Sequence, residues 1–225
     1  MPLIELDNYF DRIYCINLKS RPDRLAQFKT NYAALGTSNI QIIEAVDGKQ
    51  TDLKNWPYSP GALGCRLSHL ALYKEAVASG FSRILILEDD AVISKTFRKK
   101  FTRLINYVND DWDMIYFGGY HHLKPDRINK DIVKLNNTLS THSIAINTRC
   151  LKKIIDKIES DERWIDSVIA ELHPTMKVYG FKTPTSYQND GFSDIEGTYI
   201  KYNYTKVDRF AALVKRVLKK LTGKK

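Results

Sequence analysis

A chain of 225 residues, 43% hydrophobic and 27% charged, is long enough for one α/β domain with a substantial core, and its composition excludes a low-complexity or repeat protein. Cys15, Cys65 and Cys150 are odd in number and lack paired spacing, which argues against a disulfide framework and a zinc site and indicates reduced thiols. The net charge of +9 is concentrated in residues 200–225, which carry nine Lys or Arg and one acid; the other 199 residues are nearly neutral, with 26 basic and 25 acidic side chains.

The N-terminal segment lacks a basic region followed by a long apolar run, so it does not resemble a secretory signal. The longest apolar runs, such as Arg83–Leu87, are of strand length and far short of the roughly 20 residues that a membrane span needs. We therefore expect a cytoplasmic protein.

Strands and helices alternate along the chain. Period-2 and apolar runs predict strands, helical spacing predicts helices, and Gly or Pro marks their ends. The predicted strands are Phe10–Leu18, Ile40–Ala45, Arg83–Leu87, Asp113–Phe117 and Ser143–Ile146; the predicted helices are Asp23–Leu35, Ser59–Gly80, Phe97–Val108 and Cys150–Ile158. This order indicates an α/β fold, with a mixed, mostly parallel sheet covered by helices on both faces, over residues 1–199.

Three adjacent acids, Glu88, Asp89 and Asp90, follow the apolar strand Arg83–Leu87. Like charges so close together repel one another unless a cation neutralises them, and hard oxygen ligands suit Mn²⁺ or Mg²⁺. The carboxyl end of a strand is also where open α/β sheets bind ligands. The alternative is that one acid caps the following turn and the others are solvated; the position directly after a buried strand favours a metal site held by Glu88 and Asp90.

Beyond these acids, the sequence resembles glycosyltransferase family 25, the lipopolysaccharide-type and collagen-type sugar transferases. The resemblance spans roughly residues 12–197, and each motif is weak by itself while their joint order is specific. The matching stretches are residues 16–24 (Ile-Asn-Leu-Lys-Ser-Arg-Pro-Asp-Arg), Ala45–Gly48, residues 61–69 (Gly-Ala-Leu-Gly-Cys-Arg-Leu-Ser-His), Leu87–Asp90, Trp112–Tyr116 and Gln188–Ile195.

The resemblance implies a GT-A type domain that transfers a hexose, galactose or glucose, from a UDP-linked donor to a glycan or lipid-linked saccharide acceptor. It also implies inversion at the sugar carbon and a role in lipopolysaccharide or related glycan biosynthesis. Two rival interpretations are a catalytically silent glycan-binding or scaffold protein of the same fold and a sugar nucleotidyltransferase. The absence of a glycine-rich loop after the first strand argues against the nucleotidyltransferase, and the intact acid triplet argues against the silent protein.

The same resemblance assigns roles to single residues, each of which has a structural alternative. Arg21 and Arg24 suit a diphosphate because guanidinium groups pair with phosphate in a fork, although surface arginines are usually solvated. Asp47 precedes Gly48 in what is equally a common turn, and a lone helical histidine is more often structural. The expected donor-binding residues are Asn17, Arg21, Arg24, Asp47, Ser68, His69, Glu88, Asp89 and Gln188.

An inverting transfer also needs a carboxylate that takes the proton of the acceptor hydroxyl. Asp166 matches the place where the family carries an acid beside the acceptor, although it is also compatible with a first-turn helix acid. Asp194 is the competing base or an additional metal-site residue. None of His121, His122, His142 and His173 is expected to bind a metal, because no spacing supports a separate site.

The C-terminal segment, residues 200–225, forms a separate feature. From Arg209 to Leu221, apolar residues recur at helical spacing with Lys and Arg between them, which predicts a basic amphipathic helix. Such helices bind anionic membranes, so we expect peripheral association with the inner face of the membrane; the alternative is a helix packed on the domain. The basic residues lack interleaved aromatics, which disfavours a nucleic acid partner.

Overall fold

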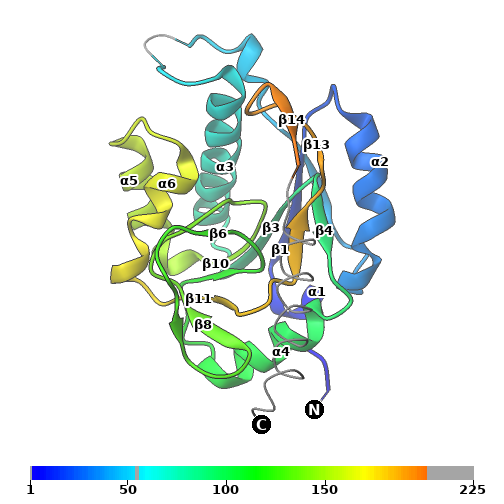
Figure 1. Ribbon diagram of the computed structural model, residues 1–225, viewed down its shortest axis with the longest axis vertical. Coiled ribbons are helices and arrows are strands. Elements are labelled where there is room, and N and C mark those ends of the chain that lie inside the picture. Colours follow the sequence, from blue (N-terminus) through cyan, green and yellow to red (C-terminus); the bar gives the residue numbers. More distant parts are fainter. Residues whose placement is uncertain (1, 54–55, 202–225) are drawn as a thin grey trace, which may run out of the picture.

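A computed structural model describes residues 2–53 and 56–201 of the chain. Its centre is a mixed sheet with helices on both faces (Figure 1). In spatial order the described strands of this sheet are β2 (Gln41–Glu44), β1 (Arg12–Asn17), β3 (Arg83–Glu88), β10 (Ser143–Asn147), β5 (Met114–Tyr116), β11 (Val178–Phe181), β8 (Ile132–Lys134) and β7 (Asp126–Arg127). The predicted basic helix from Arg209 to Leu221 lies outside the described residues.

The sheet is mixed, and most of its strands point in the same direction. β10 and β8 are antiparallel to their neighbours on both sides, and the other strands of the sheet all run in one direction. The predicted α/β class is therefore confirmed. β7, β8 and β11 were not predicted.

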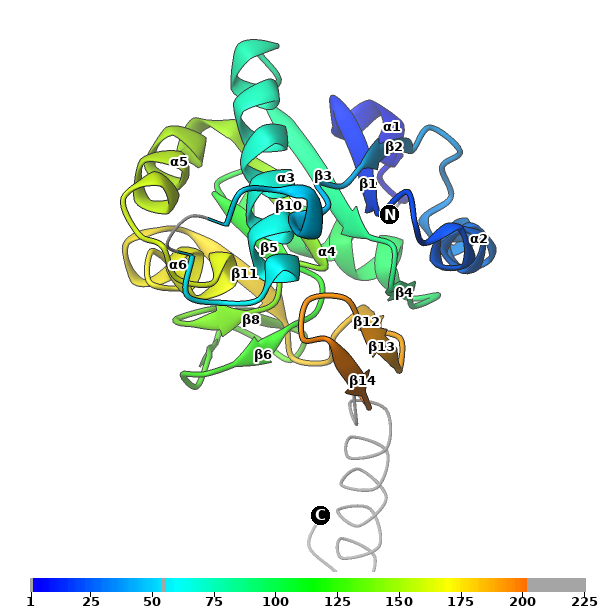
Figure 2. The ribbon, with the colours of Figure 1, turned by 90° about the horizontal axis from the view of Figure 1, so that it is seen from above.

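Helices cover the two faces of the sheet as separate layers (Figure 2). The first face carries α3 (Pro60–Ala78), α5 (Leu151–Glu159) and α6 (Ile165–Ala170), and the second carries α1 (Leu6–Tyr9), α2 (Pro22–Asn31) and α4 (Phe97–Val108). In β3, Ile84 and Ile86 pack under the first layer while Leu85 and Leu87 pack under the second. This alternation explains why the strand is apolar throughout.

Smaller elements complete the described chain. Three two-stranded ladders pair β12 (Ser186–Gln188) with β4 (Ala91–Ile93), β13 (Gly191–Ser193) with β14 (Thr198–Ile200), and β6 (Tyr120–His121) with β9 (Thr138–Leu139). The 3₁₀ turns are η1 (Tyr32–Leu35), η2 (Gly48–Gln50), η3 (Thr148–Cys150) and η4 (His173–Thr175). The helix predicted over Asp23–Leu35 is thus α2 followed by η1, which ends at Gly36 with φ 67°. In the described chain no helix is long and apolar enough to span a bilayer.

His173 is fully buried. We expect it to make the stability of the folded protein depend on pH. Its Nδ1 accepts the backbone N–H of Thr138 at 3.3 Å, and its Nε2 lies 3.2 Å from the hydroxyl of Tyr116. Burial lowers the pKa of His173 from 6.5 to about 4, because the charged ring would be cut off from water. The folded protein therefore holds this ring neutral at neutral pH.

As the pH falls, His173 takes up a proton in the unfolded chain before it does so in the folded protein. The stability that the neutral ring contributes is therefore complete above the pKa of His173 in the unfolded chain, and it is lost as the pH falls toward the pKa in the folded protein. Between about pH 7 and about pH 4.5, this residue alone is expected to remove roughly 2 to 3 kcal/mol from the free energy of unfolding. Urea unfolding at both pH values measures this loss. The variant His173→Gln should show a smaller difference by about that amount, and equal pH dependence in the two proteins would contradict the assignment.

Candidate functional site

The predicted site residues gather at the carboxyl edge of the sheet, where β2, β1 and β3 end side by side. The register pairs Asn17 at the end of β1 with Glu44, and Ile16 with Glu88. The acids that follow β3 therefore lie beside the loops that follow β1 and β2. This edge is where open α/β sheets bind their ligands.

Two hollows open at this edge, and Glu88 lines both of them. The first hollow lies over β1, β2 and the start of α3, and its lining includes Arg24, Asp47, Lys49, Ser68, His69, Glu88, Asp89 and Asp194. The second hollow lies toward β9 and the start of α6, and its lining includes Tyr120, Ser140, Thr141, Trp164, Asp166, Gln188 and Glu196. The arrangement places one acid of the triplet between two neighbouring binding spaces.

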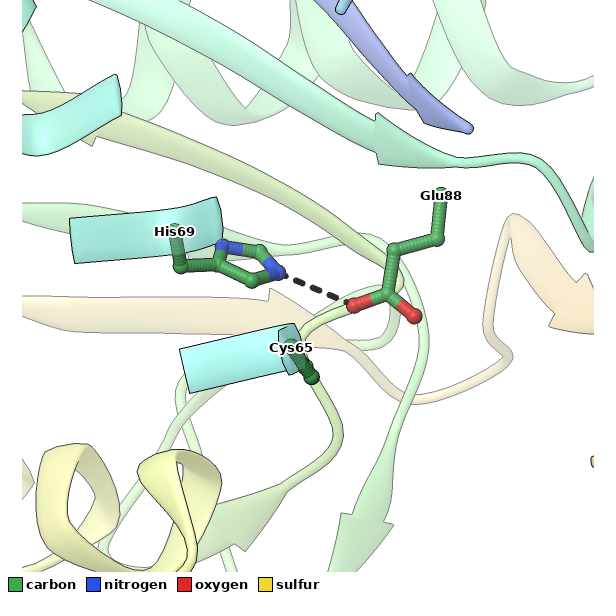
Figure 3. A group of neighbouring side chains, drawn as sticks. All are labelled: Cys65, His69 and Glu88. Carbon is green, nitrogen blue, oxygen red and sulfur yellow. Dashed lines mark hydrogen bonds and ion pairs between the residues drawn. The ribbon is translucent and has the colours of Figure 1, made fainter. Parts of the chain in front are cut away.

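Glu88, the last residue of β3, is held by two hydrogen bonds. His69 Nε2 lies 3.1 Å from Glu88 Oε1 (Figure 3). Thr141 Oγ1 donates to the same oxygen at 2.9 Å. The hydroxyl of Tyr73 lies 3.4 Å from His69 Nδ1, so the ring has a partner on each side. Burial disfavours the charge of Glu88, but the hydrogen bond and the charge of His69 outweigh it and lower the pKa of Glu88. Glu88 is therefore an oriented, ionised carboxylate.

Asp89 is buried and has both of its oxygens engaged. Asn17 Nδ2 donates to Asp89 Oδ2 at 2.6 Å, and Arg24 Nη1 donates to Asp89 Oδ1 at 3.1 Å. Asn17 also donates to the backbone oxygen of Arg21 at 3.0 Å. Asp89 thus fixes Arg24 and the loop after β1 against the end of β3.

Asp90 differs from its two neighbours because one of its oxygens has no partner among the described residues. Gln188 Nε2 donates to Asp90 Oδ2 at 3.3 Å, whereas Oδ1 is buried and forms no hydrogen bond in the described chain. Burial and the negative charge of Glu88 raise the pKa of Asp90 to about 7. A buried, unpaired carboxylate oxygen beside a second carboxylate fits a bound divalent cation, which would replace the missing partner.

Arg21 and Arg24 lie at the start of α2 and meet Asp194 from the other end of the chain. Arg21 Nη1 lies 2.5 Å from Asp194 Oδ2, and Arg24 Nη1 lies 3.7 Å from the same oxygen. Arg24 lines the first hollow, whereas Arg21 is not part of its lining. Two guanidinium groups therefore engage the carboxylate of Asp194 on the side of the first hollow.

The start of α3 closes around the first hollow through two glycines and Ser68. A Cβ at Gly61 would lie 2.1 Å from the backbone oxygen of Asp194, and one at Gly64 would lie 2.4 Å from that of Val46. Ser68 Oγ donates to the backbone oxygen of Gly64 at 2.7 Å and accepts the N–H of Val46 at 2.8 Å. Glycine is needed at both positions for these close backbone approaches, and Ser68 fastens the end of β2 to α3.

Asp47 forms a turn, which was the structural alternative expected from the sequence. It also lines the first hollow. Its carboxylate accepts the N–H of Lys49 at 3.0 Å and the side-chain amide of Gln50 at 2.9 Å, which caps η2. The cap holds the backbone of this turn along one wall of the first hollow.

Asp166 lies in the first turn of α6 and faces the second hollow. Its Oδ2 accepts the N–H of Ser140 at 3.0 Å, and its Oδ1 accepts that of Ser167 at 2.7 Å. Ser140 itself has φ 78°, and its Oγ lies 3.2 Å from Gln188 Oε1. Gln188 therefore bridges Asp90 and the segment that holds Asp166, and it lies in the second hollow.

Cys65 joins His69 and Glu88 in a group whose ligand atoms all lie within 4.8 Å of one another (Figure 3). Cys65 and His69 are one helical turn apart on α3, so both side chains face the end of β3. Burial and the charge of Glu88 raise the pKa of the Cys65 thiol well above its ordinary value. The sequence shows no metal-binding motif here, because Cys65 and His69 lie on α3 whereas Glu88 lies on β3.

Ser140, Thr141 and His142 were not predicted to belong to the site. They precede β10, which is antiparallel to β3, so the residues that enter β10 lie beside those that leave β3. The backbone oxygen of His142 accepts the N–H of Glu88 at 2.8 Å. The polar residues just before the predicted strand Ser143–Ile146 could have indicated this position. They would have done so only if that strand had been predicted to run antiparallel to Arg83–Leu87.

Comparisons with known proteins relate this chain to a described family. Residues 10–166 match the family described as "Glycosyltransferase family 25 (LPS biosynthesis protein)". The mouse protein named procollagen galactosyltransferase 2 is 34% identical over 131 residues, which cover 48% of this chain and 21% of that protein. The procollagen lysyl hydroxylase and glycosyltransferase of Acanthamoeba polyphaga mimivirus is 27% identical over 208 residues, covering 76% and 22%.

A third relative is named as inactive. The rat protein named probable inactive glycosyltransferase 25 family member 3 is 33% identical over 130 residues, which cover 48% of this chain and 23% of that protein. This chain therefore matches only about a fifth of the length of these three relatives. Similarity of this degree joins it to active and inactive proteins alike.

Proposed function

We propose that this chain, which belongs to glycosyltransferase family 25, transfers a hexose from a UDP-linked donor to a hydroxyl group of a glycan acceptor. The observation that carries the proposal is the position of Glu88 between two hollows, one with basic side chains and one with aromatic and acidic side chains. A transferase of this kind must bring two sugars together at one such boundary. The mixed α/β sheet fits the GT-A type domain that the family resemblance implies.

The first hollow suits the nucleotide diphosphate of the donor. Arg24 and Lys49 supply positive charge at its wall, and Arg21 pairs with Asp194, which also lines this hollow. Asn17 and Asp89 keep Arg24 in place, so its guanidinium is oriented before the donor binds. Fork-shaped guanidinium groups bind phosphate oxygens in pairs, which gives the diphosphate a fixed orientation.

Glu88 and Asp90 would hold Mn²⁺ or Mg²⁺ at the boundary between the hollows. When bound, such an ion neutralises the charge that builds on the departing diphosphate. The chain's own contribution is to orient the two carboxylates: His69 and Thr141 fix Glu88, and Gln188 fixes Asp90.

We assign the base of the transfer to Asp166, because its carboxylate lines the second hollow. In the proposed reaction, the acceptor oxygen forms a bond to the anomeric carbon of the donor while the bond from that carbon to the diphosphate oxygen breaks. The acceptor proton passes to Asp166, and UDP leaves with the bonding electron pair. Attack from the second hollow, opposite the leaving group, would invert the anomeric carbon.

The competing function is that of a catalytically silent binding protein of the same family. It is supported by the relatives that are named as inactive. Calorimetric titration with UDP, UDP-galactose and UDP-glucose, in Mn²⁺ and again with a chelator, tests the donor part of the proposal. We expect binding that requires the metal. Failure of all three ligands to bind would contradict the proposed donor class.

The variant Cys65→Ser tests whether the hard-oxygen pair or the Cys65 group holds the ion. Because Mn²⁺ and Mg²⁺ prefer oxygen to sulfur ligands, we expect the Mn²⁺ dependence of donor binding to change by less than about threefold. The same titration measures this change. A loss of roughly tenfold or more would instead assign the ion to Cys65, His69 and Glu88.

A further inference from the structure

The second hollow differs from the first in having no basic side chain in its lining within the described chain. Glu88, Asp166 and Glu196 contribute carboxylates to its wall, and no Lys, Arg or His belongs to its lining within the described chain. The first hollow also contains carboxylates, but Arg24 and Lys49 lie among them. Among the described residues, an anionic ligand would therefore find basic partners in the lining of the first hollow and none in that of the second.

Aromatic rings supply the other distinctive part of this lining. Trp164 directly precedes α6, and its ring lies 5.7 Å from that of Tyr58 at an angle of 60°, so a neighbouring ring supports it. Tyr120 lines the same hollow and is 58% exposed. The C–H face of a pyranose ring is apolar and packs on such aromatic surfaces, while its hydroxyls need polar partners such as Ser140 and Gln188.

We propose that the second hollow takes an uncharged pyranose packed against Trp164, and that Glu196 together with Asp166 excludes sugars that carry a carboxylate or a phosphate. This inference rests on the proposed sugar transfer, since it names the acceptor class for that reaction. It assigns Trp164 to acceptor binding and Glu196 to acceptor selection.

Charge repulsion is the physical basis of this selection. A bound cation would offset the charge of Glu88, but Asp166 must stay ionised to receive the acceptor proton, and Glu196 stands exposed on the turn between β13 and β14. An acidic acceptor would place a further negative charge among these groups without a basic partner. Juxtaposed like charges lower the affinity for the wrong ligand and so provide specificity.

Ligand-observed saturation-transfer NMR on the full chain, with UDP and Mn²⁺ present, tests the proposal. The probes are two matched pairs that differ only at one carbon: methyl β-D-glucoside with methyl β-D-glucuronide, and methyl β-D-galactoside with its galacturonide. We expect at least one neutral glycoside to bind roughly tenfold more tightly than its acidic counterpart. Equal or tighter binding of the uronides, or no binding of any glycoside, would overturn the proposal.

Three variants and one control locate the effect. Trp164→Ala should weaken binding of the neutral glycoside at least about fivefold, and Trp164→Phe should restore most of it, because the second variant keeps an aromatic face. Glu196→Gln should narrow the neutral-to-acidic ratio by roughly threefold or more, whereas Glu159→Gln, on α5 and outside the lining, should leave the ratio unchanged. An unaltered ratio in Glu196→Gln would refute the role of Glu196.

The same samples separate this proposal from the proposed function. UDP binding in Mn²⁺ reports on the first hollow alone, so its absence contradicts the sugar transfer whatever the glycosides do. Normal UDP binding together with equal binding of the neutral glycosides and the uronides would contradict only the proposed acceptor class.

Discussion

Replacing Asp90 with asparagine is expected to weaken metal-dependent donor binding by about 100-fold or more. One oxygen of Asp90 is buried without a partner in the described chain, and the pKa of the group is raised to about 7, so the site is electrostatically incomplete without a cation. Asparagine keeps the shape and the contact with Gln188 but removes the charge that attracts the ion. Calorimetric titration of the variant with UDP-galactose and UDP-glucose in Mn²⁺ measures the loss.

The same variant should not destabilise the metal-free protein. Glu88 and Asp89 adjoin Asp90, so removing its charge relieves repulsion and should leave the midpoint of thermal unfolding unchanged or higher. Asp156→Asn provides the matched control, because Asp156 is an exposed α5 residue whose side chain is 62% accessible. Undiminished donor affinity in Asp90→Asn would refute the metal assignment, and a large fall in unfolding temperature would indicate a structural role.

Asp166→Asn is expected to lower kcat by roughly 10² to 10⁴-fold, which is the usual contribution of a positioned general base. The backbone N–H groups of Ser140 and Ser167 orient the carboxylate toward the second hollow. Because Asp166 does not line the first hollow, the dissociation constant for the donor should change by less than about twofold. Steady-state kinetics of transfer, combined with the donor titration, separates these two quantities.

Asp194→Asn is the contrasting variant, because Asp194 was the competing base. Its carboxylate is engaged by Arg21 and Arg24 beside the first hollow, so its loss should weaken donor binding while kcat at saturating donor falls by less than about tenfold. The opposite pattern, with kcat lost in Asp194→Asn and retained in Asp166→Asn, would make Asp194 the base.

The sequence predicted the first half of the fold well because its signals there are local. The apolar run Arg83–Leu87 became β3, and the Ser59-Pro60 start of α3 is a helix cap with proline at the first position. The position of the acid triplet at the carboxyl edge follows directly from β3. The helix predicted through Leu35 ends as a 3₁₀ turn, a boundary that spacing alone does not resolve.

The parts of the site that were not predicted depend on long-range pairing. Thr141 reaches Glu88 only because β10 runs antiparallel to β3. The backbone oxygen of Phe192 and the carboxylate of Asp194 meet Arg24 across more than half of the chain, because the segment around β13 folds back over α2. Neither contact leaves a periodic pattern in the sequence. The assignment of Asp166 came from the family resemblance, and geometry then placed it beside the second hollow.

The most direct test of the central claim is turnover of the donor. UDP release from UDP-galactose and UDP-glucose should be measured with neutral methyl glycosides as acceptors, in Mn²⁺ and again with a chelator, with the glycoside product identified by mass spectrometry. We expect Mn²⁺-dependent UDP release and a disaccharide glycoside product, both lost in Asp90→Asn. Metal-dependent donor binding without UDP release from either donor would contradict it and place this chain with its inactive relatives.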